Sequence, residues 1–242
     1  DVLVASIFVN RLQFLPHEDF DSYPRTFEQD CAQLEALGCD LLFLPSEAEL
    51  YPQPQTFKVL PDPSLANMLE GEFRPGFFTG VCTVVMKLFN CVFSGGAGVA
   101  GFGQKDYQQQ LIIRQMVRQF ALPIDIVTCP TTRAADGLAM SSRNMYLSPS
   151  ERVQAVQLSA ALKDLAAKAR EMSASGAISS ASIGAWEAEA MEHLRSQGWQ
   201  PDYLTVRQPS DLSPVVAATS EPLVVLGAAK LGKTRLIDNL MV

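Results

Sequence analysis

The stretch Gly101-Phe102-Gly103-Gln104-Lys105-Asp106-Tyr107-Gln108-Gln109 decides the fold, because in it a strand turns through glycines into a helix. Apolar residues predict a short strand from Val99 to Phe102, and helical spacing predicts a helix from Gln104 to about Phe120. Unpaired backbone N–H groups and the helix dipole favour anions at such a junction. Two glycines before a helix are also typical of a simple tight turn, and that alternative stays open at this point.

The spacing within this helix indicates which of its faces is buried. Apolar side chains recur at one-face helical spacing at Ile112, Ile113, Met116, Val117 and Phe120. Lys105, Asp106 and Gln109 fall on that same face, whereas Arg114 and Arg118 fall on the opposite one. We therefore expect Lys105, Asp106 and Gln109 to face a cleft.

Strands alternate with helices on both sides of this segment. Val2–Val9 has the pattern of a fully buried strand, and Leu41–Leu44 and Ile124–Cys129 have the pattern of further strands. This alternation predicts an α/β fold with a parallel sheet, whose ligand sites lie beyond the carboxyl ends of its strands. Since a strand begins at the first residues and no initiator Met precedes it, we expect earlier elements of the fold to be absent from this chain.

The pattern changes after about residue 131. Asp136-Gly137 is a hairpin turn signal, and Ser148-Pro149-Ser150-Glu151 caps a helix. Three short strands are predicted at Tyr203–Arg207, Leu223–Leu226 and Arg235–Leu240. We therefore predict a first domain at 1–131, incomplete at its N-terminus, and a smaller α+β lid domain at 132–242.

Composition narrows the classes of function. The 242 residues are 48% hydrophobic and 19% charged with a net charge of -7, which is typical of a globular protein and disfavours nucleic acid as a partner. Five cysteines without a CxxC pair favour free, buried thiols in the cytoplasm, and two histidines argue against a metal site. No apolar run approaches the ~20 residues of a membrane span.

Two further segments carry chemistry. Met140-Ser141-Ser142-Arg143-Asn144, expected on the strand that leaves the Asp136-Gly137 turn, combines hydroxyls with a guanidinium, a set that suits a polyphosphate. A polar hairpin edge is the alternative. Asn10 and Gln13 follow the first strand, where a parallel sheet places its ligands, although isolated amides also cap loops.

Together these segments resemble the pantothenate synthetase family of the nucleotidyltransferase superfamily, over essentially the whole chain. The likeness is carried by Ser6–Phe14, Tyr23–Thr26, Leu69–Gly71, Arg74–Gly76, Gly103–Gln109, Asp136–Asn144 and Arg235–Asn239. The resemblance implies a Rossmann-like, N-terminally truncated nucleotidyltransferase domain with a lid, a homodimer, and an ATP-dependent ligase. In the implied reaction, the carboxylate of pantoate attacks the α-phosphate of ATP to give pantoyl adenylate, and the amine of β-alanine then displaces AMP.

The resemblance also assigns residues to ligands. Gln13 and Gln109 hold pantoate, and Asn10, which follows the same strand as Gln13, is a further substrate-binding candidate. The implied nucleotide-binding residues are Gly103, Gln104, Lys105, Asp106, Thr132, Met140, Ser141, Ser142 and Arg143. Of these, Lys105 and Arg143, together with Mg²⁺, are expected to stabilise the charge that develops on the phosphate oxygens.

The sequence departs from the family pattern in three places. The family's upstream His-x-Gly-His has no counterpart, Phe77 stands where the family has His after Arg-Pro-Gly, and Phe93–Gly101 is longer and richer in glycine. These departures predict an inactive chain. They leave two alternatives open, a non-catalytic remnant of such a ligase and another adenylate-forming nucleotidyltransferase.

Overall fold

The computed structural model describes residues 2–174, 179–216 and 221–242, which form two compact units. The first unit contains residues 1–100 and 112–126, and the second contains 101–111 and 127–242. The second unit therefore includes a segment of the predicted first domain. Because compactness does not define a domain boundary, the predicted division at residue 131 stays a prediction.

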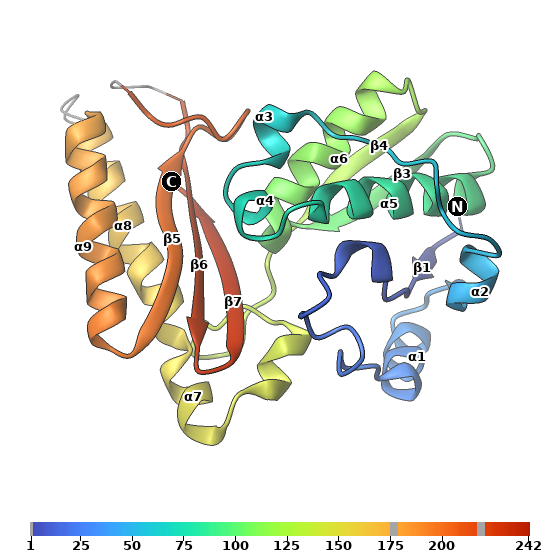
Figure 1. Ribbon diagram of the computed structural model, residues 1–242, viewed down its shortest axis with the longest axis horizontal. Coiled ribbons are helices and arrows are strands. Elements are labelled where there is room, and N and C mark those ends of the chain that lie inside the picture. Colours follow the sequence, from blue (N-terminus) through green and yellow to red (C-terminus); the bar gives the residue numbers. More distant parts are fainter. Residues whose placement is uncertain (1, 175–178, 217–220) are drawn as a thin grey trace. The chain divides into compact units, whose positions relative to one another are not determined.

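The helices and strands follow the predicted alternation (Figure 1). Elements of the first unit are β1 (Val4–Ser6), η1 (Arg11–Gln13), α1 (Phe27–Ala36), β2 (Leu41–Phe43), α2 (Glu47–Leu50), α3 (Pro63–Ala66), α4 (Glu70–Phe73) and α5 (Phe77–Phe93). Three elements contribute residues to both units: β3 (Gly98–Gly103), α6 (Tyr107–Gln119) and β4 (Ile124–Cys129). Elements of the second unit are η2 (Gln104–Asp106), η3 (Ser142–Tyr146), α7 (Pro149–Gln154), α8 (Val156–Ala174), α9 (Ser180–Ser196), β5 (Trp199–Arg207), β6 (Val224–Leu231) and β7 (Thr234–Met241).

The first strand is shorter and less buried than its sequence predicts. β1 pairs in parallel with β2, with Val4 opposite Leu41, but Val2 and Leu3 are 66% and 57% exposed. Among the described residues β1 has no strand neighbour other than β2, so its apolar run is not enclosed. The prediction of a fully buried strand is therefore wrong, whereas the prediction of a parallel pairing is confirmed.

A glycine lets α5 approach the loop that follows β1. A Cβ atom built on Gly80 would lie 2.3 Å from the carbonyl oxygen of Leu12, which no side chain can tolerate. Phe78 and Val81 on α5 are buried, whereas Phe77 is only half-buried. Gly80 thus fixes η1 against the helix.

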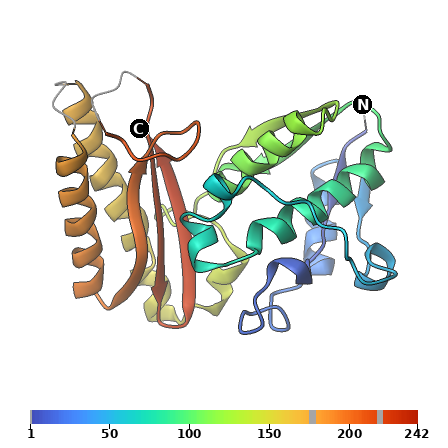
Figure 2. The ribbon, with the colours of Figure 1, turned by 45° about the horizontal axis from the view of Figure 1, so that its top comes forward.

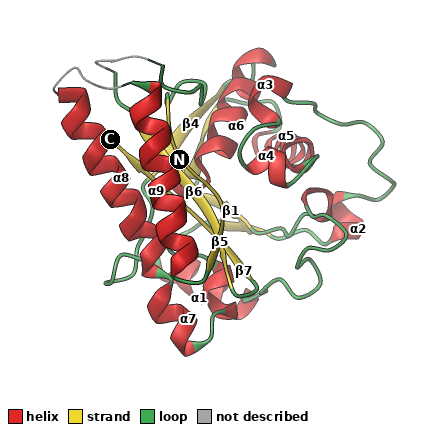
Figure 3. Cartoon of the chain, turned by 60° about the vertical axis from the view of Figure 1, so that its left-hand side comes forward, coloured by secondary structure: helices red, strands yellow, loops and turns green. Residues whose placement is uncertain are grey.

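Most of the second unit is an antiparallel sheet with helices on one face, which agrees with the predicted α+β class. Its strand order is β5-β6-β7, and α8 and α9 cover one side of the sheet (Figure 2; Figure 3). Leu162, Leu165 and Leu194 of these helices pack with Leu204 and Val225 of the sheet in one apolar core. The α/β class with a separate α+β C-terminal part is thereby confirmed.

Two local predictions are corrected. Residues after the Asp136-Gly137 turn form the 3-10 helix η3 and not a strand, because the Ser141 hydroxyl accepts a hydrogen bond from the Arg143 N–H and caps it at 3.3 Å. All five cysteines are free, but only Cys82 is buried, while Cys91 and Cys129 are exposed. Within the described residues, no helix combines the length and the apolar character that crossing a bilayer requires.

Candidate active site

The strand-to-helix junction begins with a 3-10 turn. η2 spans Gln104–Asp106, and α6 begins only at Tyr107. The α-helical spacing therefore does not predict which way Lys105 and Asp106 face, because a 3-10 turn has about three residues per turn. Asp106 is exposed, and Lys105 and Gln109 are half-buried. The predicted inward face is therefore wrong for Asp106 and for Phe120, which lies beyond the end of α6 and is 57% exposed.

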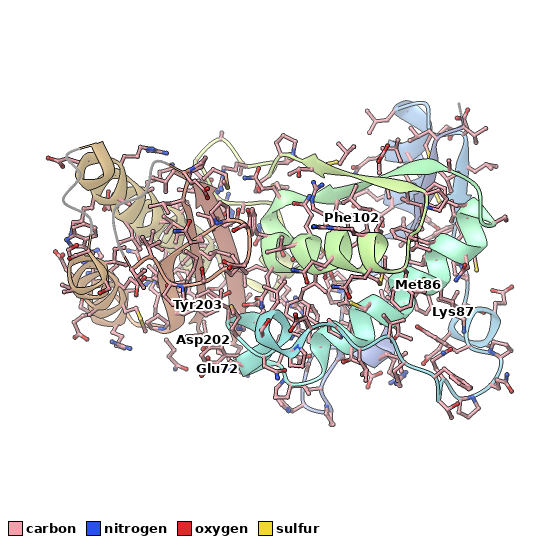
Figure 4. All side chains as sticks on the ribbon, turned by 90° about the horizontal axis from the view of Figure 1, so that it is seen from above. Glu72, Met86, Lys87, Phe102, Asp202 and Tyr203 are labelled. Carbon is pink, nitrogen blue, oxygen red and sulfur yellow. The ribbon has the colours of Figure 1, made fainter. Side chains whose placement is uncertain are left out.

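The buried amides of this segment are the neighbours of Gln109. Gln108 and Gln110 are 3% and 4% exposed. Gln110 donates from Nε2 to the carbonyl of Phe102 at 3.1 Å, and its Oε1 accepts from the Thr128 hydroxyl at 3.2 Å. Figure 4 shows Phe102 where β3 runs beside α6. Gln110 thus ties the end of β3 and the end of β4 to the first turn of α6, a contact that the sequence pattern missed.

The polar segment at 140–144 starts from a tight turn. Gly137 has φ +94°, a conformation that favours glycine, and its N–H donates to the carbonyl of Ala134 at 2.8 Å. The Met140 N–H donates to the carbonyl of Thr132 at 2.9 Å. Thr132, Met140 and Ser142 are exposed, whereas Ser141 and Arg143 are half-buried.

One strand contacts both segments that carry the phosphate-binding candidates. β7 contacts both η2, which carries Lys105, and η3, which carries Arg143. Asn239 of β7 donates from Nδ2 to the carbonyls of Gln104 and Lys105, at 2.9 and 2.8 Å. Each of the two segments that carry a candidate cation thus contacts β7.

Both polar groups of the Asn10 side chain already form hydrogen bonds within the protein. It is 1% exposed, its Nδ2 donates to the carbonyl of Gly80 at 3.1 Å, and its Oδ1 accepts from the Tyr51 hydroxyl at 2.9 Å. Burial, with a smaller contribution from the charge of Glu47, raises the pKa of Tyr51 to about 12, so this hydroxyl keeps its proton. The geometry favours a supporting role for Asn10 over direct ligand contact.

Asn10 also orients Gln13. Its Nδ2 lies 3.3 Å from Oε1 of Gln13, which accepts the hydrogen bond. Among the described residues the Nε2 group of Gln13 donates to no protein acceptor, and the side chain is half-buried. An amide held by its oxygen presents its two N–H donors to a ligand carboxylate or hydroxyl.

Arg74 fixes the loop that follows Gln13. Its guanidinium binds Glu18 in a fork at 2.6 and 2.9 Å and donates to the carbonyl of Gln13 at 3.2 Å. The Phe77 ring lies 3.8 Å from the guanidinium carbon, a cation–π contact. Phe77 therefore supports Arg74. Arg74 belongs to the segments that carry the family resemblance, but the sequence pattern assigned it no role.

The chain is similar to known proteins along nearly its whole length. The family model described as Pantoate-beta-alanine ligase matches residues 1–241. A pantothenate synthetase of Paracidovorax citrulli is 64% identical over an alignment of 244 residues. The alignment covers 99% of this chain and 83% of the relative.

Two solved structures are similar over the same range. The crystal structure of the pantothenate synthetase of Thermus thermophilus has a TM-score of 0.87 and 41% identity, covering 99% of this chain and 83% of that one. A pantoate-beta-alanine ligase of Francisella tularensis, solved with beta-gamma ATP and beta-alanine, has a TM-score of 0.73 and 32% identity, covering 100% of this chain and 79% of that one.

Proposed function

Because the chain belongs to the pantoate-beta-alanine ligase family, we infer that it condenses pantoate with β-alanine to form pantothenate at the expense of ATP. The family match along nearly the whole chain is the observation that carries this function. The chain is a ligase, and neither alternative, a non-catalytic remnant or a nucleotidyltransferase for another acid, finds support among the comparisons.

We propose that Lys105 and Arg143 stabilise the first transition state. As the pantoate carboxylate attacks the α-phosphate, negative charge grows on the phosphate oxygens and pyrophosphate leaves. One ammonium and one guanidinium, carried by the segments η2 and η3 that contact β7, would meet that charge without a large reorganisation. The exposed and half-buried residues Gly103, Gln104, Asp106, Thr132 and Met140–Ser142 are proposed to surround the nucleotide.

Pantoate is proposed to bind through Gln13 and Gln109. Gln13 is supported by the Asn10 and Arg74 contacts, which fix its side chain and its backbone. In the second step the amine of β-alanine attacks the acyl carbon of the adenylate, the bond to AMP breaks, and the amine loses a proton. No side-chain nucleophile takes part in either step, so most of the protein's contribution is positioning and charge stabilisation.

Mg²⁺ is proposed as the metal that accompanies ATP. The described residues contain no group of three or more His, Cys, Asp or Glu side chains that could hold a metal ion, and Mg²⁺ is commonly bound largely by substrate phosphates and water. When bound in that way, it neutralises part of the phosphate charge.

A cytoplasmic homodimer is proposed as the working state. The free state of all five cysteines supports a reducing compartment. Light scattering coupled to size-exclusion chromatography of the full-length protein measures the mass, and a monomer at micromolar concentration would contradict the dimer.

Pantoate-dependent exchange of labelled pyrophosphate into ATP tests the function. We expect exchange with pantoate alone, and pantothenate together with AMP once β-alanine is added. Exchange of equal rate with other hydroxy acids, or none with pantoate, would contradict the proposed substrate.

A further inference from the structure

The segment Arg235–Asn239 carries part of the family resemblance, yet the reaction assigns it no task. Asp238 and Asn239 are adjacent on β7 and are 5% and 3% exposed. Neighbours on a strand point to opposite faces, so one polar side chain of such a pair usually reaches solvent. Burying both is costly unless each has defined partners.

Asn239 holds the segment that carries Lys105. Its Nδ2 group uses both protons on consecutive carbonyls of η2, those of Gln104 at 2.9 Å and Lys105 at 2.8 Å. These two bonds fix the backbone from which the Lys105 side chain leaves. The Oδ1 atom of Asn239 is buried and has no hydrogen-bond partner among the described residues, a cost that stability alone would not favour.

Asp238 holds the segment that leads to Arg143. Its carboxylate binds the Arg133 guanidinium in a fork at 2.7 and 2.8 Å. The same guanidinium donates to the carbonyl of Gly137 at 3.1 Å, and Arg133 pairs with Ala139 across the turn. Arg133 therefore fixes the turn from which residues 140–143 emerge.

The backbone joins the two halves of this network. The Asn239 N–H donates to Oδ1 of Asp238 at 2.8 Å, and the Arg133 guanidinium donates to the carbonyl of Asn239 at 3.3 Å. The segments with Lys105 and Arg143 are thus bonded to two consecutive residues of one strand, although 38 positions separate the two cations in the sequence.

We propose that Asp238 and Asn239 are positioning residues that set the placement of Lys105 relative to Arg143 for the adenylation step. This proposal rests on the proposed function of those two cations. A placement role acts on the transition state, so loss of the pair lowers the rate of adenylate formation more than the affinity for ATP or pantoate. A purely structural role would lower the stability of the second unit and leave the rate of the folded protein unchanged.

The test uses single-turnover adenylate formation by the full-length protein, with Asn239→Ala as the variant. We expect the rate at saturating ATP and pantoate to fall at least about 10-fold, since a displacement near 1 Å can cost ~10²-fold. The dissociation constant for ATP is expected to stay within about threefold, because the phosphate contacts themselves remain. The rate is divided by the folded fraction measured by circular dichroism.

Asp202→Asn is the matched control. Asp202, which is labelled in Figure 4, lies on β5 and accepts a hydrogen bond from Arg235 Nε at 2.7 Å. This variant therefore also disrupts a partly buried ion pair at β7. We expect it to lower the melting temperature and leave the single-turnover rate within about twofold. An equal loss of rate in Asp202→Asn, or an unchanged rate in Asn239→Ala, would overturn the proposal.

If Asn239→Ala does not fold, the single-turnover rate of Arg133→Lys tests the proposal instead. Lysine keeps the charge but cannot form the fork to Asp238, so the rate is expected to fall while the protein remains folded. A wild-type rate in Arg133→Lys would then refute the positioning role. Wild-type protein that shows no pantoate-dependent exchange would instead refute the proposed function, which separates the two failures.

Discussion

At the scale of single residues, we expect the loss of the Lys105 ammonium group to lower the rate of the first step most. Lys105→Ala removes one of the two cations proposed to face the phosphates, and we expect the rate of pyrophosphate exchange to fall by about 10²-fold or more. Arg118→Ala is the control, because Arg118 is exposed near the end of α6 and is expected to leave the rate unchanged. Equal effects of the two changes would refute the assignment of Lys105.

Cys82 provides a second residue-scale prediction. Burial raises the pKa of the Cys82 thiol to about 12, because the thiolate would be desolvated among apolar side chains. The pKa of Cys82 in the folded protein lies above its pKa in the unfolded chain. The contribution of this thiol to the free energy of unfolding is therefore complete below the unfolded pKa and is lost as the pH rises from about 9 toward 12. We expect the native protein to react with iodoacetamide at Cys91 and Cys129 and at Cys82 only after unfolding, with peptide mass spectrometry as the measurement. Rapid labelling of Cys82 in the native state would contradict its burial.

At the scale of elements, the approach of α5 to η1 controls the Gln13 segment. Gly80→Ala would place a Cβ atom 2.3 Å from the carbonyl of Leu12, and the carbonyl of Gly80 also accepts from Asn10. We expect η1 to shift, with a loss of ~1–3 kcal/mol in the free energy of unfolding and a raised KM for pantoate. Urea denaturation and steady-state kinetics measure the two effects.

Gly184→Ala is the matched control for that change. Gly184 lies in α9, and nothing lies within 4 Å of a Cβ atom built there. Replacing a helical glycine at an open position is expected to stabilise the protein by ~0.5–1 kcal/mol without changing KM. A higher pantoate KM in this variant would mean that the Gly80 effect is not specific to η1.

At the scale of the whole molecule, the two substrates are expected to protect different segments of the chain. In hydrogen–deuterium exchange, ATP is expected to slow exchange at residues 101–111 and 140–146, and pantoate at residues 10–18 and around Gln109, because ligands stabilise the backbone that they contact. Protection by ATP confined to residues outside 101–111 and 140–146 would contradict the proposed nucleotide site.

The sequence by itself determined several of the elements and the class of the fold. β4, the C-terminal strands and the strand-to-helix junction at Gly103 follow from apolar periodicity and turn residues, which depend on neighbours only a few positions away. The capping box at Ser148 and Glu151 was readable for the same reason. The 3-10 geometry of η2 does not follow from that periodicity, because the α-helical spacing holds only from Tyr107 onward.

Only the tertiary structure decided which polar side chains are buried and what they hold. Gln108, Gln109 and Gln110 are chemically identical, yet the carbonyl of Phe102 and the hydroxyl of Thr128 select Gln110. Likewise, Asn239 reaches the carbonyl of Lys105 from 134 positions away. A hydrogen bond of that range depends on how distant strands and turns pack, and the pattern of residues near either partner does not contain that information.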